Sequence, residues 1–327
     1  MILEQDVRTA IATFERLRSS IGEVIVGHDE IVRFALISLL CKGNVLFEGV
    51  PGLGKTLLVR TLASALGLKF SRIQFTPDLM PADIVGTDIL TEKDGHREFS
   101  FAAGPVFANV ILADEVNRAT PKTQSALLEA MEERTVTVGA KTYVLEEPYI
   151  VLATQNPIEM EGTYPLPEAQ VDRFLLKAKV SFPTLEQLVQ ITERNTEGVG
   201  IQLPQPTATA NDILMARRIV REIPIAAALR EYIARLVLAT HPESEYSPAQ
   251  IKEYVEYGGS PRAAIALVMG AKAHAFLAGE VNVRRDDIQA VFQAALTHRL
   301  VLNFRGEAEG VSSDSLLDQV WKKTATS

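Results

Sequence analysis

The sequence predicts an α/β domain, in which helices sandwich a parallel sheet, followed by an all-α domain. Short apolar runs alternate with helical stretches as far as Pro183, a pattern typical of chains that build a parallel sheet. A glycine-rich loop at residues 49–56 lies between the first apolar run and a helical stretch. Only helical stretches follow Pro183. We therefore expect an α/β domain over residues 1–182, an all-α domain over 183–310 and a tail over 311–327.

The elements of the first domain follow from apolar periodicity. An opening helix is indicated by an apolar face that recurs every three or four residues, at Leu3, Val7, Ala10, Phe14, Leu17 and Ile21. Strands are expected at residues 45–47, 69–75, 110–115, 149–155 and 175–180. Further helices are expected at about 29–41, 57–66, 121–133 and 168–174.

Two hairpins are expected to interrupt this core. The first covers residues 87–104 and has Asp94-Gly95 as its turn signal. The second covers 135–145 and carries Lys141 near its tip. Insertions of this kind often contact partners, although an exposed lysine at a turn is more often only solvated.

The all-α domain is predicted from helical stretches at 184–195, 211–222, 225–240, 248–257, 261–278 and 286–300, with a linker at 198–206. Ser260 suits the N-cap of the fifth helix, Pro261 its first position and Gly279 its C′ position. Arg262 then lies in the first turn, where the helix dipole disfavours a cation unless an anion lies near. Arg262 is therefore a candidate phosphate contact, or else a tolerated surface arginine. Residues 313–323 predict one or two amphipathic turns.

Composition restricts the class of protein. The chain has 327 residues, 47% of them apolar, and a net charge of −8, which argues against a mainly electrostatic nucleic-acid binder. Its one cysteine, Cys41, cannot form an internal disulfide, so a reducing cytoplasm is expected. Residues 1–21 do not resemble a signal peptide, and no apolar run nears the roughly 18 residues of a membrane span.

Residues 49–56, GVPGLGKT, match the phosphate-binding loop G-x-x-x-x-G-K-[ST]. Glycines allow successive backbone N–H groups to point inward as an anion nest, and the following helix adds its positive end. Lys55 would reach the β- and γ-phosphates, and the Thr56 hydroxyl would bind Mg²⁺. The nucleotide-binding residues expected in this stretch are Gly49, Pro51, Gly52, Leu53, Gly54, Lys55, Thr56 and Leu57.

Polar residues end two of the predicted strands. Asp114 and Glu115 follow four apolar residues, at the sheet edge where α/β ligands bind. Asp114 can hold Mg²⁺, and Glu115 can orient water or take its proton, which favours hydrolysis over phosphate transfer to another substrate. Asn156 could bond both water and the γ-phosphate. Taken alone, the acids could be solvated and Asn156-Pro157 a turn opener.

Together these segments resemble the MoxR family of AAA+ ATPases, in the helix-2-insert group that includes magnesium chelatase subunits and MCM helicases. The resemblance covers about residues 21–310. Its specific matches are GVPGLGKT (49–56), ADEVNRATPKTQSALLEAMEE (113–133), LATQNPIEMEGTYPLPEAQVDRF (152–174), GGSPRA (258–263) and HRLVLNFRGEAEG (298–310). It implies a P-loop NTPase core of the AAA+ type and a helical lid.

The resemblance also implies residue roles. Asn156 takes the place of the first sensor, Arg173 that of the arginine finger directed at a neighbouring subunit, and Arg262 that of the second sensor. Val26 and Gly27 match the segment that packs on adenine. Members usually carry Gln after this Gly, whereas this chain has His28, whose role stays open.

The expected function is Mg²⁺-dependent ATP hydrolysis in a homo-oligomeric ring, most often a hexamer. Family members remodel or mature client proteins, often with a von Willebrand factor A domain. One alternative is a nucleotide-gated scaffold with little turnover. Another is a nucleic-acid translocase, which the acidic balance and the single hairpin lysine disfavour. We expect no insertion into membranes.

Overall fold

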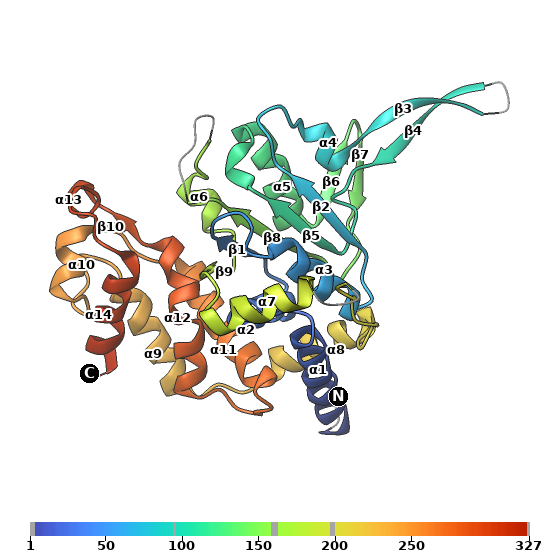
Figure 1. Cartoon of the computed structure of the whole chain (residues 1–327). Coiled ribbons are helices and arrows are strands. Elements are labelled where there is room, and N and C mark those ends of the chain that lie inside the picture. The colour runs from blue at the N-terminus through green and yellow to red at the C-terminus, as the bar shows by residue number, and fades with distance from the viewer. Residues whose placement is uncertain (1–3, 94–95, 158–162, 197–199, 326–327) are drawn as a thin grey trace. The chain divides into compact units, whose positions relative to one another are not determined.

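The computed structural model describes residues 4–93, 96–157, 163–196 and 200–325 (Figure 1). Contacts divide the chain into two compact units. The sheet unit comprises residues 12–166 and 178–214, and the helical unit comprises residues 1–11, 167–177 and 215–327. The three domain ranges predicted from the sequence stay predictions.

A five-stranded sheet forms the core of the sheet unit, in the order β2-β5-β8-β1-β9. The strands are β1 (Val45–Glu48), β2 (Phe70–Gln74), β5 (Val110–Asp114), β8 (Ile150–Gln155) and β9 (Leu176–Lys179). β5 pairs in parallel with both β2 and β8, and β8 pairs in parallel with β1. The five predicted strands are therefore confirmed.

Helices cover this sheet because its central strands are apolar on both faces. The first four residues of β5 and the first five of β8 are buried, which requires cover on each side. Helix α2 (Asp29–Leu40) packs on β1 and β8, and α3 (Lys55–Ala65) packs on β2 and β5. The other helices of four or more residues with at least part of their length in this unit are α1 (Glu4–Gly22), α4 (Pro81–Val85), α5 (Pro121–Glu133), α7 (Leu185–Thr196) and α8 (Ala210–Glu222).

The register brings the carboxyl ends of four strands to one edge. Glu48 lies opposite Gln155, and Gln74 lies opposite Asp114. Because parallel strands run in the same direction, the segments that follow them all begin at this edge. The phosphate-binding loop follows Glu48 directly, so the strand order itself assembles the candidate site.

Both predicted hairpins are present. The first pairs β3 (Gly86–Lys93) with β4 (His96–Ala103), and its predicted turn at 94–95 lies outside the described residues. The second pairs β6 (Thr135–Val138) with β7 (Lys141–Val144), where Lys141 is exposed. Phe101 of β4 stacks on Tyr143 of β7 with ring centroids 4.1 Å apart, which joins the two hairpins.

The helical unit is built mainly from helices. They are α6 (Glu168–Val171), α9 (Ala227–Leu238), α10 (Ala249–Tyr254), α11 (Pro261–Leu277), α12 (Arg285–Leu296), the 3₁₀ turn η2 (Thr297–Arg299), α13 (Phe304–Ala308) and α14 (Ser313–Ala325). α11 packs against α9 and α12, while α14 packs against α9, α10 and α12. Among the described helices, none combines the length and the apolarity of a membrane span.

The helical unit differs from the sequence expectation in several places. The helices predicted to reach residues 257 and 300 end at Tyr254 and Leu296, because β10 (Val255–Tyr257) and β11 (Val301–Leu302) pair as short antiparallel strands. The stretch predicted as one or two turns at 313–323 is a helix of 13 residues. Its buried Leu316, Leu317 and Val320 supply the packing that stabilises a helix of this length.

The capping of α11 is confirmed. The Ser260 hydroxyl accepts a hydrogen bond from the Arg262 backbone N–H, and Pro261 occupies the first turn. Gly279 has φ +75° just past the C-cap, a conformation that only glycine adopts without strain. The start of α11, and with it Arg262, is therefore fixed by local sequence.

Candidate active site

The glycine-rich loop has the backbone form of an anion nest. Gly52 and Gly54 have φ of +88° and +72°, in the left-handed region that favours glycine. Helix α3 begins directly after Gly54, so its unpaired N–H groups are at the loop. Lys55 Nζ donates to the Gly49 carbonyl at 2.6 Å. Burial lowers the pKa of Lys55, and the charges of Asp114 and Glu115 partly offset this.

Asp114 is held on both carboxylate oxygens. The buried Thr154 hydroxyl on β8 donates to Oδ1 at 2.7 Å, and Arg72 Nη2 on β2 donates to Oδ2 at 2.7 Å. The same Thr154 oxygen accepts from the Glu115 backbone N–H at 2.8 Å. Thr154 therefore fixes the end of β5 and the orientation of the Asp114 carboxylate together.

Glu115 is oriented by two donors. Its Oε2 accepts from Gln74 Nε2 on β2 at 3.1 Å and from Arg118 Nη1 at 2.9 Å. Glu115 also has φ +58°, an uncommon conformation for a residue with a side chain. Strain of this kind is often found at functional sites, where the surrounding contacts maintain it.

The loop and the carboxylates share one cavity. It has a volume of about 230 Å³ and is lined by residues 51–56 of the loop together with Arg72, Gln74, Asp114 and Glu115. A polyphosphate in this space would meet backbone N–H groups and Lys55 on one side. It would meet a pair of carboxylates on the other.

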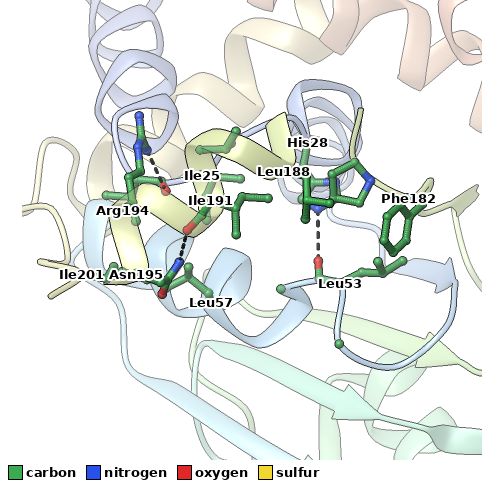
Figure 2. Close-up of a pocket in the computed structure, with 15 residues that line it drawn as sticks. Ile25, His28, Leu53, Leu57, Phe182, Leu188, Ile191, Arg194, Asn195 and Ile201 are labelled. Carbon is green, nitrogen blue, oxygen red and sulfur yellow. Dashed lines mark hydrogen bonds between the residues drawn. The ribbon is translucent and has the colours of Figure 1, made fainter. Parts of the chain in front are cut away.

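The first cavity adjoins a second, more apolar one, and Figure 2 shows the residues that line the second. It measures about 330 Å³ and shares Gly52, Leu53 and Gly54 with the polar cavity. Val26 and Leu57 line it, and helix α7 contributes apolar side chains such as Leu188. The two cavities meeting at the loop suit a ligand with a flat apolar end and a polyanionic end.

The segment before α2 is tied to both the loop and α7. His28 Nε2 donates to the Leu53 carbonyl at 3.1 Å, which gives a contact for the residue whose role the sequence left open (Figure 2). Arg194 Nη1 of α7 donates to the Glu23 carbonyl at 2.8 Å. A Cβ on Gly27 would lie 2.4 Å from the Gln187 side chain, so only glycine fits there without a shift.

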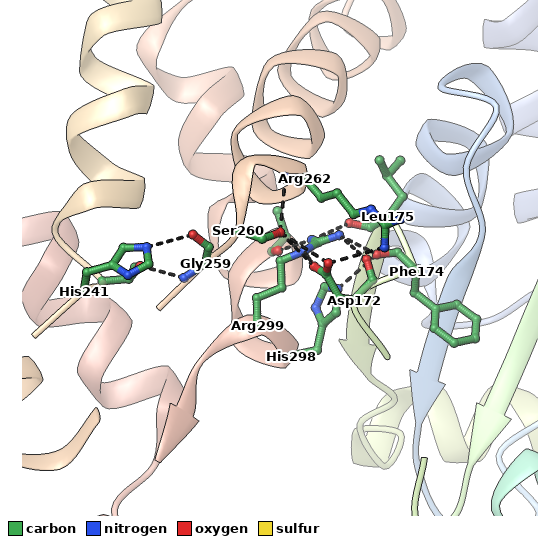
Figure 3. Close-up of polar contacts among 11 residues, drawn as sticks. Asp172, Phe174, Leu175, His241, Gly259, Ser260, Arg262, His298 and Arg299 are labelled. Carbon is green, nitrogen blue, oxygen red and sulfur yellow. Dashed lines mark hydrogen bonds and ion pairs between the residues drawn. The ribbon is translucent and has the colours of Figure 1, made fainter. Parts of the chain in front are cut away.

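The remaining predicted residues fall in two places. Asn156 is buried after β8, where Asn117 Nδ2 donates to its carbonyl at 3.1 Å and Asn117 Oδ1 accepts from its backbone N–H at 3.4 Å. Arg173 and Arg262 belong to the helical unit, whereas both cavities are lined by the sheet unit. Arg173 is exposed, and Arg262 pairs with Asp172 at 3.6 Å (Figure 3).

Comparison with known proteins shows which family this chain belongs to. A model of the ATPase family associated with various cellular activities (AAA) matches residues 44–176, and a model of an AAA lid domain matches residues 249–320. The chain is 43% identical over 317 residues to "Chaperone MoxR1" of Mycobacterium tuberculosis, covering 96% of this chain and 82% of that protein. The chain belongs to the MoxR family of AAA+ ATPases.

Two further comparisons agree with this assignment to the MoxR family. "Protein MoxR" of Methylorubrum extorquens is 32% identical over 317 residues, covering 91% of this chain and 89% of that protein. A solved structure of a candidate ATPase from Cytophaga hutchinsonii superposes with a TM-score of 0.92 at 43% identity, covering 98% of this chain and 96% of that one. The AAA family implies nucleotide binding, which fits the loop and its two cavities.

Sequence reasoning missed the residues that orient the acids of this MoxR-family site, and the residue that holds the Asn156 backbone. The first are Arg72, Gln74, Arg118 and Thr154, and the second is Asn117. The signal for two of them was available, because Arg72 and Gln74 lie near the carboxyl end of a predicted strand. Only the strand order, which puts β2 beside β5, shows that they face the acids.

Proposed function

We propose that this chain hydrolyses ATP with Mg²⁺ in a homo-oligomeric ring, a hexamer, and that hydrolysis drives remodelling or maturation of client proteins in the cytoplasm. One observation carries the proposal. The carboxylates of Asp114 and Glu115 line the same cavity as a phosphate-binding loop, and an apolar cavity adjoins it. A site for phosphate binding alone has no need of two acids at this position.

The chain's own residues support each part of the hydrolytic reaction. The loop N–H groups and Lys55 would hold the phosphates, and the adjoining cavity, which is lined by Val26 just before Gly27, would hold the base. Glu115, held by Gln74 and Arg118, would orient the attacking water and accept its proton. Asn156, fixed through Asn117, would contact the γ-phosphate.

The donor set fits Mg²⁺. The Thr56 hydroxyl and the Asp114 carboxylate are hard oxygen donors that line the same cavity. Mg²⁺ commonly takes only one or two protein carboxylates and completes its shell with phosphate oxygens and water. When bound, the ion neutralises charge that develops on the phosphates.

The two arginines of the helical unit would act on phosphate charge. We assign Arg173, which is exposed, as a finger that reaches the nucleotide of a neighbouring subunit. Arg262 lies in the first turn of α11, where the helix dipole disfavours a cation and a nearby anion would offset that cost. A finger supplied in trans typically contributes about 10³–10⁵ in rate.

The proposal that this chain acts on client proteins is supported by its similarity to other proteins. One relative carries the name chaperone, and the family resemblance points to clients with a von Willebrand factor A domain. The exposed β3–β4 hairpin carries apolar residues such as Leu90 and Phe99, which suit a client contact. The single cysteine suits a reducing cytoplasm.

The test is the steady-state ATPase rate per protomer over a wide range of protein concentration. We expect the specific rate to rise with concentration and to fall about 10³-fold or more in Arg173→Ala. Arg218→Ala, which removes another exposed arginine of the helical unit, is the matched control and should keep the wild-type rate. A low, flat rate that Arg173→Ala does not change would refute the finger and favour a nucleotide-gated scaffold.

A further inference from the structure

The matched segment at residues 298–310 begins with His298-Arg299, for which neither the sequence nor the ATPase site supplies a role. Arg299 is nearly fully buried, with 6% of its surface exposed. A guanidinium removed from water in this way is costly unless its donors are satisfied. Its partners should therefore show what the residue is for.

Most of those partners lie on the segment that carries Arg173 (Figure 3). Arg299 Nη2 donates to the carbonyls of Asp172 at 3.0 Å and Phe174 at 2.7 Å. Its Nη1 donates to the Leu175 carbonyl at 3.2 Å, and also to Ala295. One planar fork thus fixes the backbone on both sides of Arg173.

Asp172 and His298 complete the arrangement. Arg299 Nε donates to Asp172 Oδ1 at 2.7 Å, which gives the buried cation its counter-charge. His298 Nε2 donates to the Phe174 carbonyl at 3.1 Å. The backbone at 172–175 is therefore held by buried groups, while the Arg173 side chain between them is exposed.

Asp172 also connects this segment to the start of α11. The Ser260 hydroxyl lies 3.2 Å from Asp172 Oδ1, and Arg262 pairs with Oδ2 at 3.6 Å. Arg262 thus shares the Asp172 carboxylate with Arg299, and Arg173 is the next residue in the chain after Asp172. All of these residues lie in the helical unit, so their geometry is internal to it.

We propose that Arg299, acting with Asp172, is a positioning residue that presents Arg173 to the nucleotide of the neighbouring subunit. The proposal rests on the proposed ATPase function. An arginine that only closed the end of α12 would need the Ala295 carbonyl alone. Here four of the five acceptors belong to residues 172–175, directly beside the finger.

The first test replaces Arg299 with lysine, which keeps the charge and removes the planar fork. We expect kcat to fall about 10- to 100-fold, since a misplacement of about 1 Å can cost about 10²-fold, while KM changes less than about threefold. Arg285→Lys is the matched control on α12, because Arg285 contacts Tyr232 and Trp321 rather than the 172–175 segment. Asp172→Asn should lower kcat by a smaller factor in the same direction.

A mixing experiment separates positioning from general damage. A Glu115→Gln protomer keeps an intact finger but is expected to hydrolyse ATP very slowly, whereas an Arg299→Lys protomer keeps its own ATP site. In mixed rings at equal amounts, about a quarter of the interfaces combine the intact site with the intact finger. We expect the mixture to exceed the mean of the two pure proteins clearly, as Arg173→Ala mixed with Glu115→Gln should. The proposal would be overturned if mixing with Glu115→Gln raised the ATPase rate of Arg173→Ala but raised that of neither Arg299→Lys nor Asp172→Asn.

Hydrogen exchange tests the same proposal without ATPase activity. Arg299→Lys should speed amide exchange in residues 170–177 and leave α11 unchanged. If exchange in 170–177 is unaltered, or rises equally throughout the helical unit in both Arg299→Lys and Asp172→Asn, the positioning role is refuted. If the wild-type protein hydrolyses no ATP, the proposed function fails and this exchange measurement alone decides whether Arg299 holds the segment.

Discussion

Two clusters of arginine and acidic residues, one around Glu115 and one around Arg173, each hold a residue that we propose to act on ATP. The two clusters are built from different parts of the sequence. Around the phosphate-binding loop, Glu115 is held by Gln74 and Arg118. In the helical unit, the segment of Arg173 is held by Arg299, which lies more than a hundred residues away in the chain. In both clusters a group proposed to act on ATP is kept in place by residues that are not proposed to touch it.

The difference lies in how the supporting residues reach their place. β2 and β5 are neighbours in the sheet, and their pairing puts Gln74 opposite Asp114, so that the Gln74 side chain reaches Glu115. The Arg299 network depends instead on a 3₁₀ turn after α12 and on an irregular segment after α6. Strand pairing is made by the backbone and tolerates substitution of one side chain. The contacts to residues 172–175 depend instead on the single buried guanidinium of Arg299. We expect the helical cluster to be the more sensitive to conservative replacement.

Among the substitutions that test the comparison of the two clusters, we expect the largest loss of activity at Glu115. Glu115→Gln keeps the shape of the side chain and its acceptor oxygen but cannot take a proton. We expect kcat to fall about 10²- to 10⁴-fold, with ATP binding retained. Single-turnover hydrolysis and equilibrium nucleotide binding measure the two quantities separately. Glu133→Gln, at the exposed end of α5, is the control, and an active Glu115→Gln protein would exclude Glu115 as the base.

A smaller effect is expected at Lys55. Lys55→Ala removes a charged donor from the polar cavity, which is typically worth about 1.5–3 kcal/mol per hydrogen bond to a charged group. ATP affinity should therefore fall about 10- to 150-fold. Calorimetry with ATP measures this, with the exposed Lys122→Ala on α5 as the control. Equal affinity in the two variants would mean that the phosphates bind elsewhere.

The sequence predicted the parts of this molecule that follow from contiguous patterns. The loop at 49–56, the five strands and the cap of α11 each have a local signal, and each is present. Arg72 and Thr154 could not be assigned, because their role depends on which strands become neighbours. Arg299 could not be assigned either, since an arginine after a helix normally indicates a solvated C-terminus. Only the fold shows that it is buried against residues 172–175.

The apolar cavity gives a third, smaller effect. Leu188 of α7 lines this cavity, and Leu188→Ala removes three carbons from a side chain that is 39% exposed. We estimate a loss of about 1 kcal/mol, or about fivefold, in ATP affinity. Binding of tripolyphosphate, which lacks the base, should stay unchanged. Val189→Ala, an exposed neighbour on α7, is the control, and an equal loss for both ligands would contradict the placement of the base in this cavity.

The smallest effect is expected at His298, and only in acid. Burial lowers the pKa of His298 well below its ordinary value, and the charges of Arg299 and Lys177 lower it further, against the bond to the Phe174 carbonyl. Below about pH 6.5 the unfolded chain therefore binds a proton that the folded chain rejects, so stability is intact above that pH and declines below it.

His298→Gln should remove this contribution while keeping an N–H donor for Phe174. Urea unfolding followed through Trp321, the one tryptophan of the chain, reports on the helical unit. Between pH 7 and 5 we expect the free energy of unfolding to fall more steeply for the wild type than for His298→Gln. The difference between the two slopes should reach up to about 1.4 kcal/mol per pH unit. Other titrating groups are common to both proteins, so the difference in slope isolates His298. Equal slopes would show that the folded chain does not oppose protonation of His298.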